Sequence, residues 1–348
     1  MLVEHVTLRN YRSYASLDLT LTRGLVLVVG PTGVGKTNLL ESLHVATQGF
    51  SPRTRQDAQL IRFGEPAGRI ALGGYRAETK LDVSVTLRRD QAKEARLNGA
   101  RLPSAESLRR ELSTLVFTPD RLTVVKGGPA ARRAYFDRVL ARLFPARAGA
   151  PQDYLAALAQ RNAALRRVQL RLSDHTALAP WTERVAELGA ALVEQRRATL
   201  AALAHAFAER ADELGLPDAR LGYEAEPPTV ALLEAGLARD VERGTTGIGP
   251  HLDDVLVASG ARDLRRFGSQ GEQRLAVLSL LLAEAELLPT PPLLLFDDVL
   301  SELDPGRREV LARRVAGMGQ TMITATHRSA LPIAPAQLVE VEHGSART

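Results

Sequence analysis

Residues Gly30-Pro31-Thr32-Gly33-Val34-Gly35-Lys36-Thr37 fit the pattern G-x-x-x-x-G-K-[ST]. An apolar run from Leu25 to Val29 precedes this stretch, and a helical pattern from Asn38 to Thr47 follows it. This order of strand, loop and helix is the context in which the pattern forms a phosphate-binding loop. Its glycines let backbone N–H groups turn around an anion at the positive end of the helix dipole. The stretch therefore predicts nucleotide binding.

Two side chains of the loop have distinct expected roles. Lys36 would reach the β- and γ-phosphates, and Thr37 would be a ligand of Mg²⁺. We also expect Arg12, in a loop between two strands, to fold over the nucleotide; an ordinary surface arginine is the alternative. The residues expected to bind the nucleotide here are Gly30, Pro31, Thr32, Gly33, Val34, Gly35, Lys36, Thr37, Asn38 and Arg12.

The composition is that of a globular protein. The 348 residues predict two lobes, and 45% of them are hydrophobic, which is enough to build a core. No apolar segment approaches the roughly 20 residues of a membrane span, no signal peptide is visible, and there is no cysteine. We therefore expect a cytoplasmic protein. A formal net charge of +5 makes nucleic acid a candidate partner, with a solvated basic face as the alternative.

The first part of the chain alternates between apolar and polar residues as β-strands do. Val3–Leu8 and Leu17–Leu21 predict two edge strands that lead into the strand before the phosphate-binding loop. Further on, Arg69–Ala77 and Leu81–Arg89 alternate, and Asn98-Gly99 marks a tight hairpin. These features predict an antiparallel β-subdomain.

Long helical patterns rich in Ala, Leu and Arg follow a boundary near residue 120. Tyr154–Leu172 and Trp181–Leu214 predict two amphipathic helices that pack as an antiparallel pair, the longer about 50 Å in length. From Gly244 onward, glycines, acids and β-branched residues return. We therefore divide the chain into a first nucleotide-binding lobe (1–120), an inserted helical arm (121–243) and the remainder of the nucleotide-binding domain (244–348).

Leu293–Phe296 is an apolar strand pattern that ends in Asp297 and Asp298. The carboxyl ends of buried parallel strands face the ligand crevice. Asp297 would then hold the Mg²⁺ shell opposite Thr37, and Asp298 would act as the general base on the attacking water. A helix cap or turn is the alternative for these acids.

Two shorter features follow these acids. His327 comes after the apolar pattern Thr321–Thr326, where it could contact a γ-phosphate; a structural histidine is the alternative. In Ser301–Asp304, Asp304 is an expected N-cap, because Pro305 suits the first position of a helix. The expected catalytic residues are Lys36, Asp297, Asp298 and His327, and the expected metal ligands are Thr37 and Asp297.

A second anion-binding element lies in Phe267–Arg274, ahead of a long apolar helix. Ser269 and Gly271 stand at the start of that helix. Because one nucleotide does not easily need both elements, we expect two subunits, each offering this element to the phosphate held by the other's loop. The alternative is that Ser269 caps the helix and binds nothing. Ser269, Gly271 and Gln273 are therefore expected to contact nucleotide.

Together, these motifs resemble those of a known family. The phosphate-binding loop, the Ser-x-Gly-x-Gln signature, the paired acids, Ser301–Asp304 and His327 are similar to the ABC-type ATPase motifs of SMC-like DNA-repair proteins. The similarity spans nearly the full length. It also includes Asn10–Tyr14, Val116–Asp120, Gly249–His251 with Asp253-Asp254, and Ser269–Arg274.

The resemblance implies an α/β fold: an ABC-type P-loop ATPase head, in which a mixed or parallel sheet and an antiparallel β-subdomain accompany an inserted helical lobe. It implies an ATP- and Mg²⁺-dependent homodimer that clamps double-stranded DNA near junctions with single strands. It further implies work at gapped DNA with RecO and RecR to load RecA. The resemblance places the chain in DNA repair, recombination, replication and the SOS response.

Three positions depart from the expected pattern. Leu252 stands where the family usually has Arg, and Glu272 replaces a more usual Gln, which adds negative charge near the partner's phosphate. Asp298 stands where transport ATPases carry Glu. Because Asp is one methylene shorter, it reaches the water less well. We therefore expect slow, switch-like hydrolysis, stimulated by DNA.

Other functions remain possible on the sequence. The nucleotide-binding subunit of an ABC transporter shares these motifs, but it needs a Gln where this chain has Thr118-Pro119-Asp120. A chromosome-structuring SMC protein needs a much longer arm.

Because no recognition helix or zinc motif is visible, we expect DNA contacts to be mostly with the backbone. The candidate DNA contacts are Arg53, Arg55, Arg132 and Arg133.

Overall fold

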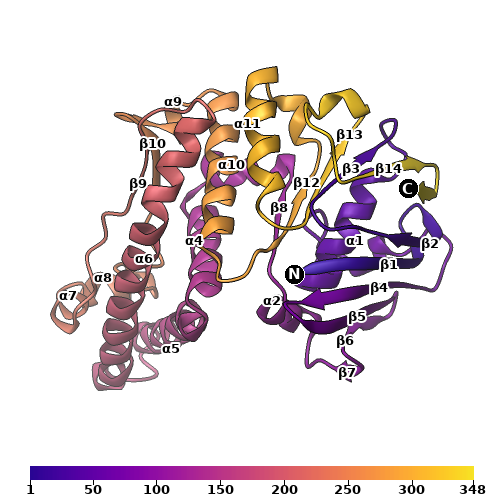
Figure 1. Cartoon of the computed structure of the whole chain (residues 1–348). Coiled ribbons are helices and arrows are strands. Elements are labelled where there is room, and N and C mark those ends of the chain that lie inside the picture. Colours follow the sequence, from indigo (N-terminus) through magenta and orange to yellow (C-terminus); the bar gives the residue numbers. More distant parts are fainter. The chain divides into compact units, whose positions relative to one another are not determined.

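The computed structural model describes residues 1–118 and 121–348, and the chain forms two compact units (Figure 1). The first unit contains Met1–Arg121, Glu213–Gly215 and Leu281–Thr348. The second contains Leu122–Asp212 and Leu216–Leu280. In the described ranges, no helix has both the length and the apolarity that crossing a bilayer requires.

The first unit contains an antiparallel sheet of six strands in the order β2-β1-β4-β5-β6-β7. At the β6–β7 turn, Asn98 (φ 48°) and Gly99 (φ 82°) both have positive φ, as a tight type I′ hairpin requires. The predicted antiparallel subdomain is therefore confirmed. Its strands are β1 (Leu2–Tyr11), β2 (Tyr14–Thr20), β4 (Ala67–Arg76), β5 (Thr79–Arg88), β6 (Gln91–Leu97) and β7 (Ala100–Arg101).

A second sheet of this unit leads into the phosphate-binding loop. Its order is β15-β14-β3-β13-β12-β8, and all neighbours pair in parallel except the β14–β15 hairpin. Strands β3, β8, β12 and β13 are buried along their whole length, which explains their continuous apolar runs. The strands are β3 (Leu25–Val29), β8 (Thr114–Phe117), β12 (Leu293–Phe296), β13 (Thr321–Ala325), β14 (Gln337–Glu342) and β15 (Ser345–Arg347).

Of the two expected N-terminal edge strands, β2 lies at the edge of its sheet, whereas β1 does not. β1 pairs with β2 on one side and β4 on the other, so it lies inside its sheet. Neither strand pairs with β3, which belongs to the other sheet. Alternation reports that one strand face is exposed, but it does not specify which strand is the neighbour.

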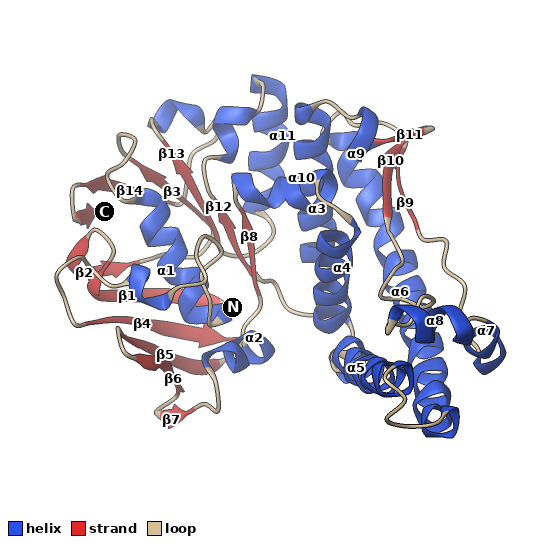
Figure 2. Ribbon diagram, turned by 180° about the vertical axis from the view of Figure 1, so that it is seen from behind, coloured by secondary structure: helices blue, strands red, loops and turns tan.

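Helix α1 (Lys36–Gln48) packs between the two sheets of the first unit (Figure 2). Every residue from Leu39 to Gln48 is buried. Its buried polar groups are satisfied: Gln48 Nε2, for example, donates to the Leu112 carbonyl at 2.9 Å. Because the close-packed core fixes a helix that is buried all round, the loop at its N-terminus is held in place.

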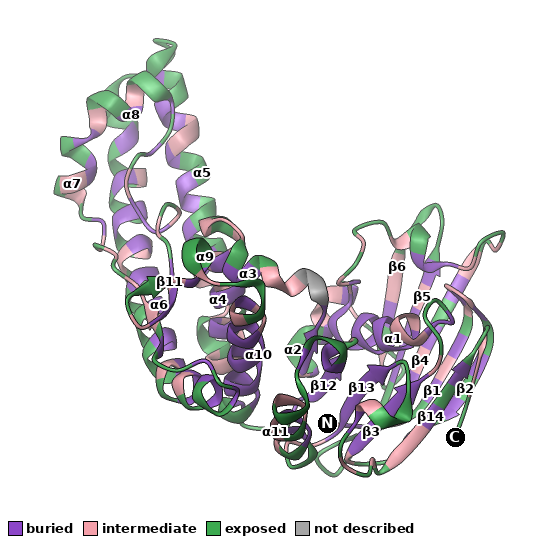
Figure 3. Cartoon of the chain, turned by 90° about the horizontal axis from the view of Figure 1, so that it is seen from above, coloured by how far each residue is buried: buried purple, intermediate pink, exposed green. Residues whose placement is uncertain are grey.

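The second unit is mostly helical, with a small antiparallel sheet in the order β11-β10-β9. Helices α5 and α6 pack as the predicted antiparallel pair, because Tyr154 lies in one cluster with Leu192, and Trp181 packs against another cluster that contains Leu165. Figure 3 shows buried and exposed residues alternating along α5. The elements are α3 (Thr123–Lys126), α4 (Pro129–Leu143), α5 (Ala150–Gln169), α6 (Ala179–Glu213), β9 (Ala219–Gly222), α7 (Val230–Ala235), α8 (Leu237–Arg243), β10 (Leu256–Ser259), β11 (Arg262–Asp263), α9 (Leu264–Phe267) and α10 (Gln270–Leu287).

The compact units and the predicted segments differ at the second boundary. Residues 244–280 belong to the second unit, because β10 pairs with β9 of the arm segment. Helix α10 passes from the second unit into the first between Leu280 and Leu281. As domains, the segments divided at 120 and 243 stay a prediction. Of the Val116–Asp120 motif, Pro119 and Asp120 lie outside the described residues.

Candidate nucleotide-binding site

Strand β3 leads into the phosphate-binding loop, and glycine is required at two of its turns. Gly35 has φ 123°, and a Cβ there would lie 2.8 Å from Ser13 Oγ. A Cβ at Gly30 would lie 2.3 Å from the Val341 carbonyl oxygen. The loop can therefore pack against its neighbours only without side chains at these positions. Its backbone N–H groups are left to form an anion cradle.

Lys36 begins helix α1, and its side chain folds back over the loop. Its Nζ donates to the carbonyls of Gly30 at 2.6 Å and Pro31 at 2.8 Å. Partial burial lowers the pKa of Lys36, and the negative charges of Asp298 and Asp297 oppose that shift. Phosphate oxygens are stronger, charged acceptors than carbonyls. Lys36 is therefore positioned to exchange these carbonyls for a phosphate.

Thr37 and Asp297 meet although they are 260 residues apart. Thr37 Oγ1 donates to Asp297 Oδ1 at 2.9 Å, and Thr324 Oγ1 donates to the same oxygen, also at 2.9 Å. Burial raises the pKa of Asp297, and the hydrogen bonds from Thr324 and Thr37 oppose the rise. Sequence reasoning missed Thr324, because it lies within the apolar run of β13. The signal that could have found it is a hydroxyl residue near the end of β13, the strand that lies between β3 and β12.

This donor set fits Mg²⁺. One hydroxyl and one carboxylate meet at the carboxyl ends of parallel strands, beside the phosphate cradle. Mg²⁺ is usually held by one or two protein oxygens, with water and substrate phosphates completing the octahedron. No group of three or more His, Cys, Asp or Glu side chains suited to a metal occurs in the part of the chain that the structure describes. A Mg²⁺ site that nucleotide phosphates and water complete does not need such a group of side chains.

Asp298 and His327 follow adjacent strands of the same sheet. Asp298 is exposed, with φ 52°, and its N–H donates to Thr324 Oγ1 at 2.8 Å. Ser301 Oγ donates to the Asp298 carbonyl at 2.8 Å, so the backbone is held while the carboxylate faces solvent. His327 is also exposed, at the end of β13. Their catalytic roles stay predictions. Asp304 caps α11 (Pro305–Ala316) as expected.

The turn between β1 and β2 braces the loop. Tyr14 OH donates to the Gly35 carbonyl at 3.1 Å. Asn38 Nδ2 donates to Ser13 Oγ at 3.0 Å. These contacts attach the loop and the first turn of α1 to the antiparallel sheet.

Arg12 binds an acid of α1. Its guanidinium donates to both oxygens of Glu41, at 2.9 and 2.8 Å. Glu41 is only 2% exposed, and it also accepts a hydrogen bond from Ser51 Oγ at 2.6 Å. A buried carboxylate needs a charged partner. Arg12 is thus held by Glu41 rather than extended over the loop, and its contact with nucleotide stays a prediction.

Ser269 caps helix α10 in the second unit. The Glu272 N–H donates to Ser269 Oγ at 3.2 Å, and the Ser269 N–H donates to Glu272 Oε2 at 2.8 Å. This reciprocal pair is a capping box. Arg262 donates to Glu272 Oε1 at 2.7 Å, and the bonds from Ser269 and Arg262 lower the pKa of Glu272. The departure at Glu272 therefore has a structural use in this chain.

The other two signature residues differ from each other. A Cβ at Gly271 would meet nothing nearer than Ser269 Oγ at 3.9 Å, so the chain's own packing does not require glycine there. Gln273 is buried, and its Nε2 donates to the Leu264 carbonyl at 2.8 Å. This side chain satisfies a carbonyl of helix α9 in the ligand-free chain, and the expected contact between Gln273 and nucleotide stays a prediction. Ser269 and the phosphate-binding loop belong to different compact units.

The four arginines expected at DNA differ in exposure. Arg132 is 3% exposed and donates to both oxygens of Asp254 at 2.6 Å, so this structure holds it inside the chain, and its expected DNA contact stays a prediction. Arg133 donates to the Asp253 carbonyl at 2.6 Å, and burial lowers its pKa. Helical periodicity could not show that the Asp254 carboxylate and the Asp253 carbonyl, more than 100 residues away, accept hydrogen bonds from these arginines.

The remaining two candidate arginines lie in the first unit. Arg53 donates to Asn38 Oδ1 at 3.1 Å and lies 3.5 Å from Glu41 Oε2, which places it beside the first turn of α1. Arg55 is exposed. Their DNA contacts stay predictions.

His251 fixes the glycine-rich segment that precedes Leu252. Its Nε2 lies 3.1 Å from the Thr246 carbonyl, which can only accept, so Nε2 carries the hydrogen. Nδ1 then accepts from Tyr154 OH at 2.7 Å. Burial lowers the pKa of His251. Leu252 itself is exposed, so the chain's own fold does not explain its departure from Arg.

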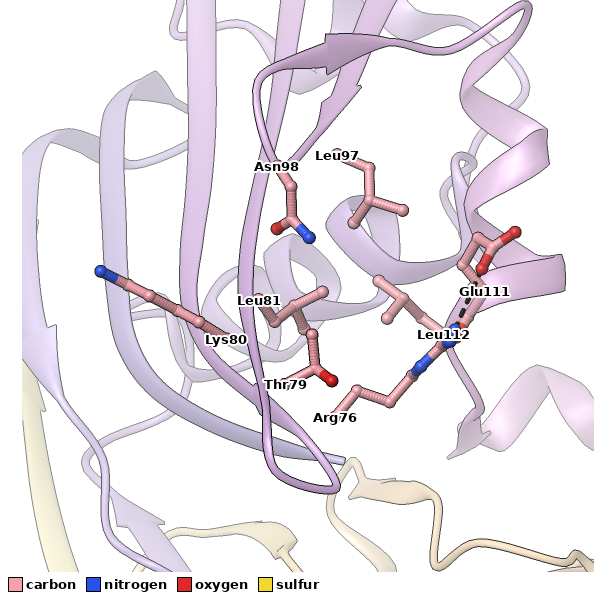
Figure 4. Close-up of a pocket in the computed structure, with 8 residues that line it drawn as sticks. All are labelled: Arg76, Thr79, Lys80, Leu81, Leu97, Asn98, Glu111 and Leu112. Atoms are coloured by element: carbon pink, nitrogen blue, oxygen red, sulfur yellow. Dashed lines mark hydrogen bonds and ion pairs between the residues drawn. The ribbon is translucent and has the colours of Figure 1, made fainter.

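A small hollow in the first unit is separate from this site. It has a volume of about 190 Å³ and lies between the β4–β5 hairpin, the β6–β7 turn and α2 (Leu108–Glu111) (Figure 4). Arg76 Nη1 donates to Glu111 Oε2 at 3.0 Å on one side of it. None of its lining residues belongs to the phosphate-binding loop.

Comparison with known proteins agrees with these motifs. The family model for the RecF/RecN/SMC N terminal domain matches residues 2–347. The DNA replication and repair protein RecF of Kineococcus radiotolerans is 36% identical, over 96% of this chain and 95% of that protein. The chain belongs to the RecF family. RecF of Lacticaseibacillus casei is 32% identical, over 94% of this chain and 93% of that protein.

Solved structures agree with the RecF assignment. The structure of the recombination mediator protein RecF-ATPrS in RecFOR pathway has a TM-score of 0.84 and 25% identity, and covers 99% of this chain and 97% of that one. An Smc head domain from Pyrococcus furiosus shares the fold, with a TM-score of 0.62 and 16% identity over 99% of this chain and 95% of that one. The fold is therefore the SMC/RecF ABC-type ATPase head, as the resemblance implied.

Proposed function

We propose that this RecF-family chain is a recombination mediator of DNA repair whose ATP state controls dimerisation and its grip on duplex DNA near junctions with single strands. The observation that carries the proposal is the contact between Thr37 and Asp297 at the phosphate-binding loop. The curated relatives are DNA replication and repair proteins, and the similar solved structure is a recombination mediator with bound ATPrS. The family gives the transporter alternative no support.

ATP and Mg²⁺ are the proposed cofactors. The loop N–H groups and Lys36 would bind the phosphates, and Thr37 and Asp297 would hold Mg²⁺. When bound, Mg²⁺ supplies charge neutralisation between the β- and γ-phosphates. Thr324 orients the Asp297 carboxylate toward Thr37 by donating to the same oxygen.

Hydrolysis would be slow and switch-like. Asp298 would accept the proton of the attacking water, since its carboxylate is exposed while two hydrogen bonds hold its backbone. Its side chain is shorter than the Glu of transport ATPases, so it reaches the water less well. His327, at the end of the neighbouring strand, would contact the γ-phosphate. We further propose that DNA stimulates this step.

The site would be completed in trans. Ser269 and Gly271 of one subunit would meet the nucleotide on the loop of the other, and the open space at Gly271 supports this. The proposed protein partners are RecR, RecO and RecA, because the similar recombination mediator acts in the RecFOR pathway. Gapped double-stranded DNA would be the nucleic-acid partner, and the cytoplasm the place of action.

Light scattering with and without ATP, repeated with gapped DNA, tests the proposal. At micromolar concentration the mass should be that of a monomer without ATP and of a dimer with ATP and Mg²⁺. Gapped DNA should then add its own mass only in the ATP state. An ATP-saturated protein that stays a monomer would contradict the trans arrangement.

A further inference from the structure

Phe63 is the most exposed large hydrophobic side chain in the described part of the chain, with 98% of its surface accessible. It lies in the turn between the 3₁₀ helix Asp57–Leu60 and strand β4. A single exposed Phe is common on protein surfaces, so exposure alone indicates nothing. The backbone around it and the charges beside it make this one different.

The turn that carries Phe63 is held by hydrogen bonds on both sides. The Arg62 N–H donates to the Asn10 carbonyl at 2.9 Å, and the Glu65 N–H donates to the Arg62 carbonyl at 3.1 Å. Asn10 Nδ2 donates to Glu65 Oε2 at 3.1 Å. Gly64 turns the chain with φ 89°. Phe63 is therefore displayed by a fixed backbone, so binding would not have to order the turn.

Exposed arginines lie at the same end of the antiparallel sheet. Arg89 Nε donates to the Glu65 carbonyl at 2.8 Å, which places it against the turn. Arg88 is exposed opposite Ala67, the first residue of β4. Arg69 is exposed two residues farther along the same strand. The turn that carries Phe63 thus lies beside three arginines, and Glu94 is the acid that interacts with one of them, Arg88.

The same turn is joined to the nucleotide site. Arg62 Nη1 donates to the Ser13 carbonyl at 2.6 Å, and Ser13 Oγ accepts from Asn38 of helix α1. The turn and the first turn of α1 therefore share Ser13 as a common support. The residue next to Phe63 is therefore linked to the first turn of α1 by two hydrogen bonds through Ser13.

We propose that Phe63 stacks on an unpaired base at the single-stranded side of a DNA junction, while the neighbouring arginines hold the phosphates. This inference rests on the proposed DNA function. Proteins bind single strands without sequence preference by combining a basic surface with aromatic side chains, because every base has a π-face. A base inside a duplex has both faces covered by its neighbours. Phe63 would therefore favour gapped DNA over blunt duplex.

Binding of labelled DNA in the presence of ATP tests the proposal, with F63A, F63W and the control L172A. Leu172 is also exposed, at 67%, but belongs to the second unit. F63A should weaken binding to gapped DNA about tenfold, which corresponds to ~1.4 kcal/mol and lies within the range for base stacking. Its affinity for blunt duplex of equal length should change less than about twofold. F63W should bind like the wild type, and L172A should affect neither DNA.

Fluorescence gives a direct readout of stacking. Trp181 is the only tryptophan, so F63W combined with Trp181→Phe reports on position 63 alone. Gapped DNA should quench this fluorescence, and blunt duplex should not. The proposal would be overturned if F63A lost affinity equally for gapped DNA and blunt duplex. It would also be overturned if bound gapped DNA left the fluorescence unquenched. A wild type that binds neither DNA with ATP would instead overturn the proposed function.

Discussion

Two segments of the chain are proposed to bind anions: the loop at Gly30–Thr37 and the start of α10 at Ser269. Residues from other parts of the fold brace the loop, since Tyr14 binds the Gly35 carbonyl and Ser13 binds Asn38. By contrast, its own helix satisfies Ser269, through the reciprocal bonds with Glu272. The loop is thus built to bind a phosphate alone. The start of α10 is capped without a ligand, which agrees with the proposal that it meets only a phosphate already held by another subunit.

The largest expected effect comes from Lys36→Met, which removes the cation of the loop. ATP affinity should fall about 100-fold, because a charge-assisted contact to phosphate contributes ~1.5–3 kcal/mol. Titration calorimetry with ATP and Mg²⁺ measures this. Thermal unfolding without ATP is the control and should barely change, since Lys36 only bonds to two nearby carbonyls. An unchanged affinity would show that the loop is not the nucleotide site.

Ser269→Arg separates the two segments. ATP binding should stay within about twofold of the wild type, while ATP-dependent dimerisation weakens at least about tenfold, since arginine fills the space for the partner's phosphate. Ser269→Thr is the matched control, because threonine keeps the helix cap. Light scattering of both variants with ATP decides. If Ser269→Arg lost ATP binding itself, the two segments would not act on different copies.

Asp297→Asn tests the cost of burying the Asp297 carboxylate beside the loop. Because the pKa of Asp297 is raised, its contribution to stability is present at low pH and is lost as the pH rises through that pKa. The ATP-free variant should therefore be more stable than the wild type by about 0.5–1 kcal/mol at pH 7. The difference should vanish in acid.

Unfolding by denaturant at several pH values measures the Asp297→Asn effect. Asparagine still accepts from Thr37 and Thr324, so the local contacts are kept. ATP binding that depends on Mg²⁺ should be lost in the same variant. A variant less stable than the wild type at pH 7 would contradict the assignment of a burial cost to this carboxylate.

Glu272→Gln should give the smallest change. Glutamine can still complete the capping box, but the negative charge and the ion pair with Arg262 are lost. We expect ATP-dependent dimerisation to strengthen about two- to threefold, because a negative charge near the partner's phosphate is removed. The dimer dissociation constant at low and high salt measures this. Weaker dimerisation at both salt concentrations would show that the cap matters more than the charge.

The fold could be predicted from the sequence, and so could the meeting of Thr37 with Asp297 in the candidate site. Residues that follow parallel strands lie at one sheet edge, which is why Thr37 and Asp297 could be paired across 260 residues. The partners of arginine and glutamine side chains could not be predicted, because a helical pattern does not show which polar residue is buried. Arg132 bonds to Asp254, and Gln273 bonds to helix α9, by tertiary packing alone.

Strand β3 has a consequence for how the protein is made. Both of its neighbours, β13 and β14, come from the last part of the chain. At roughly 5–20 residues per second, a ribosome needs roughly 15–60 s to add the nearly 300 residues that separate β3 from β13. Until then the strand that leads into the loop has no partner. We therefore expect the phosphate-binding loop to take its final form only after β13 and β14 have been made.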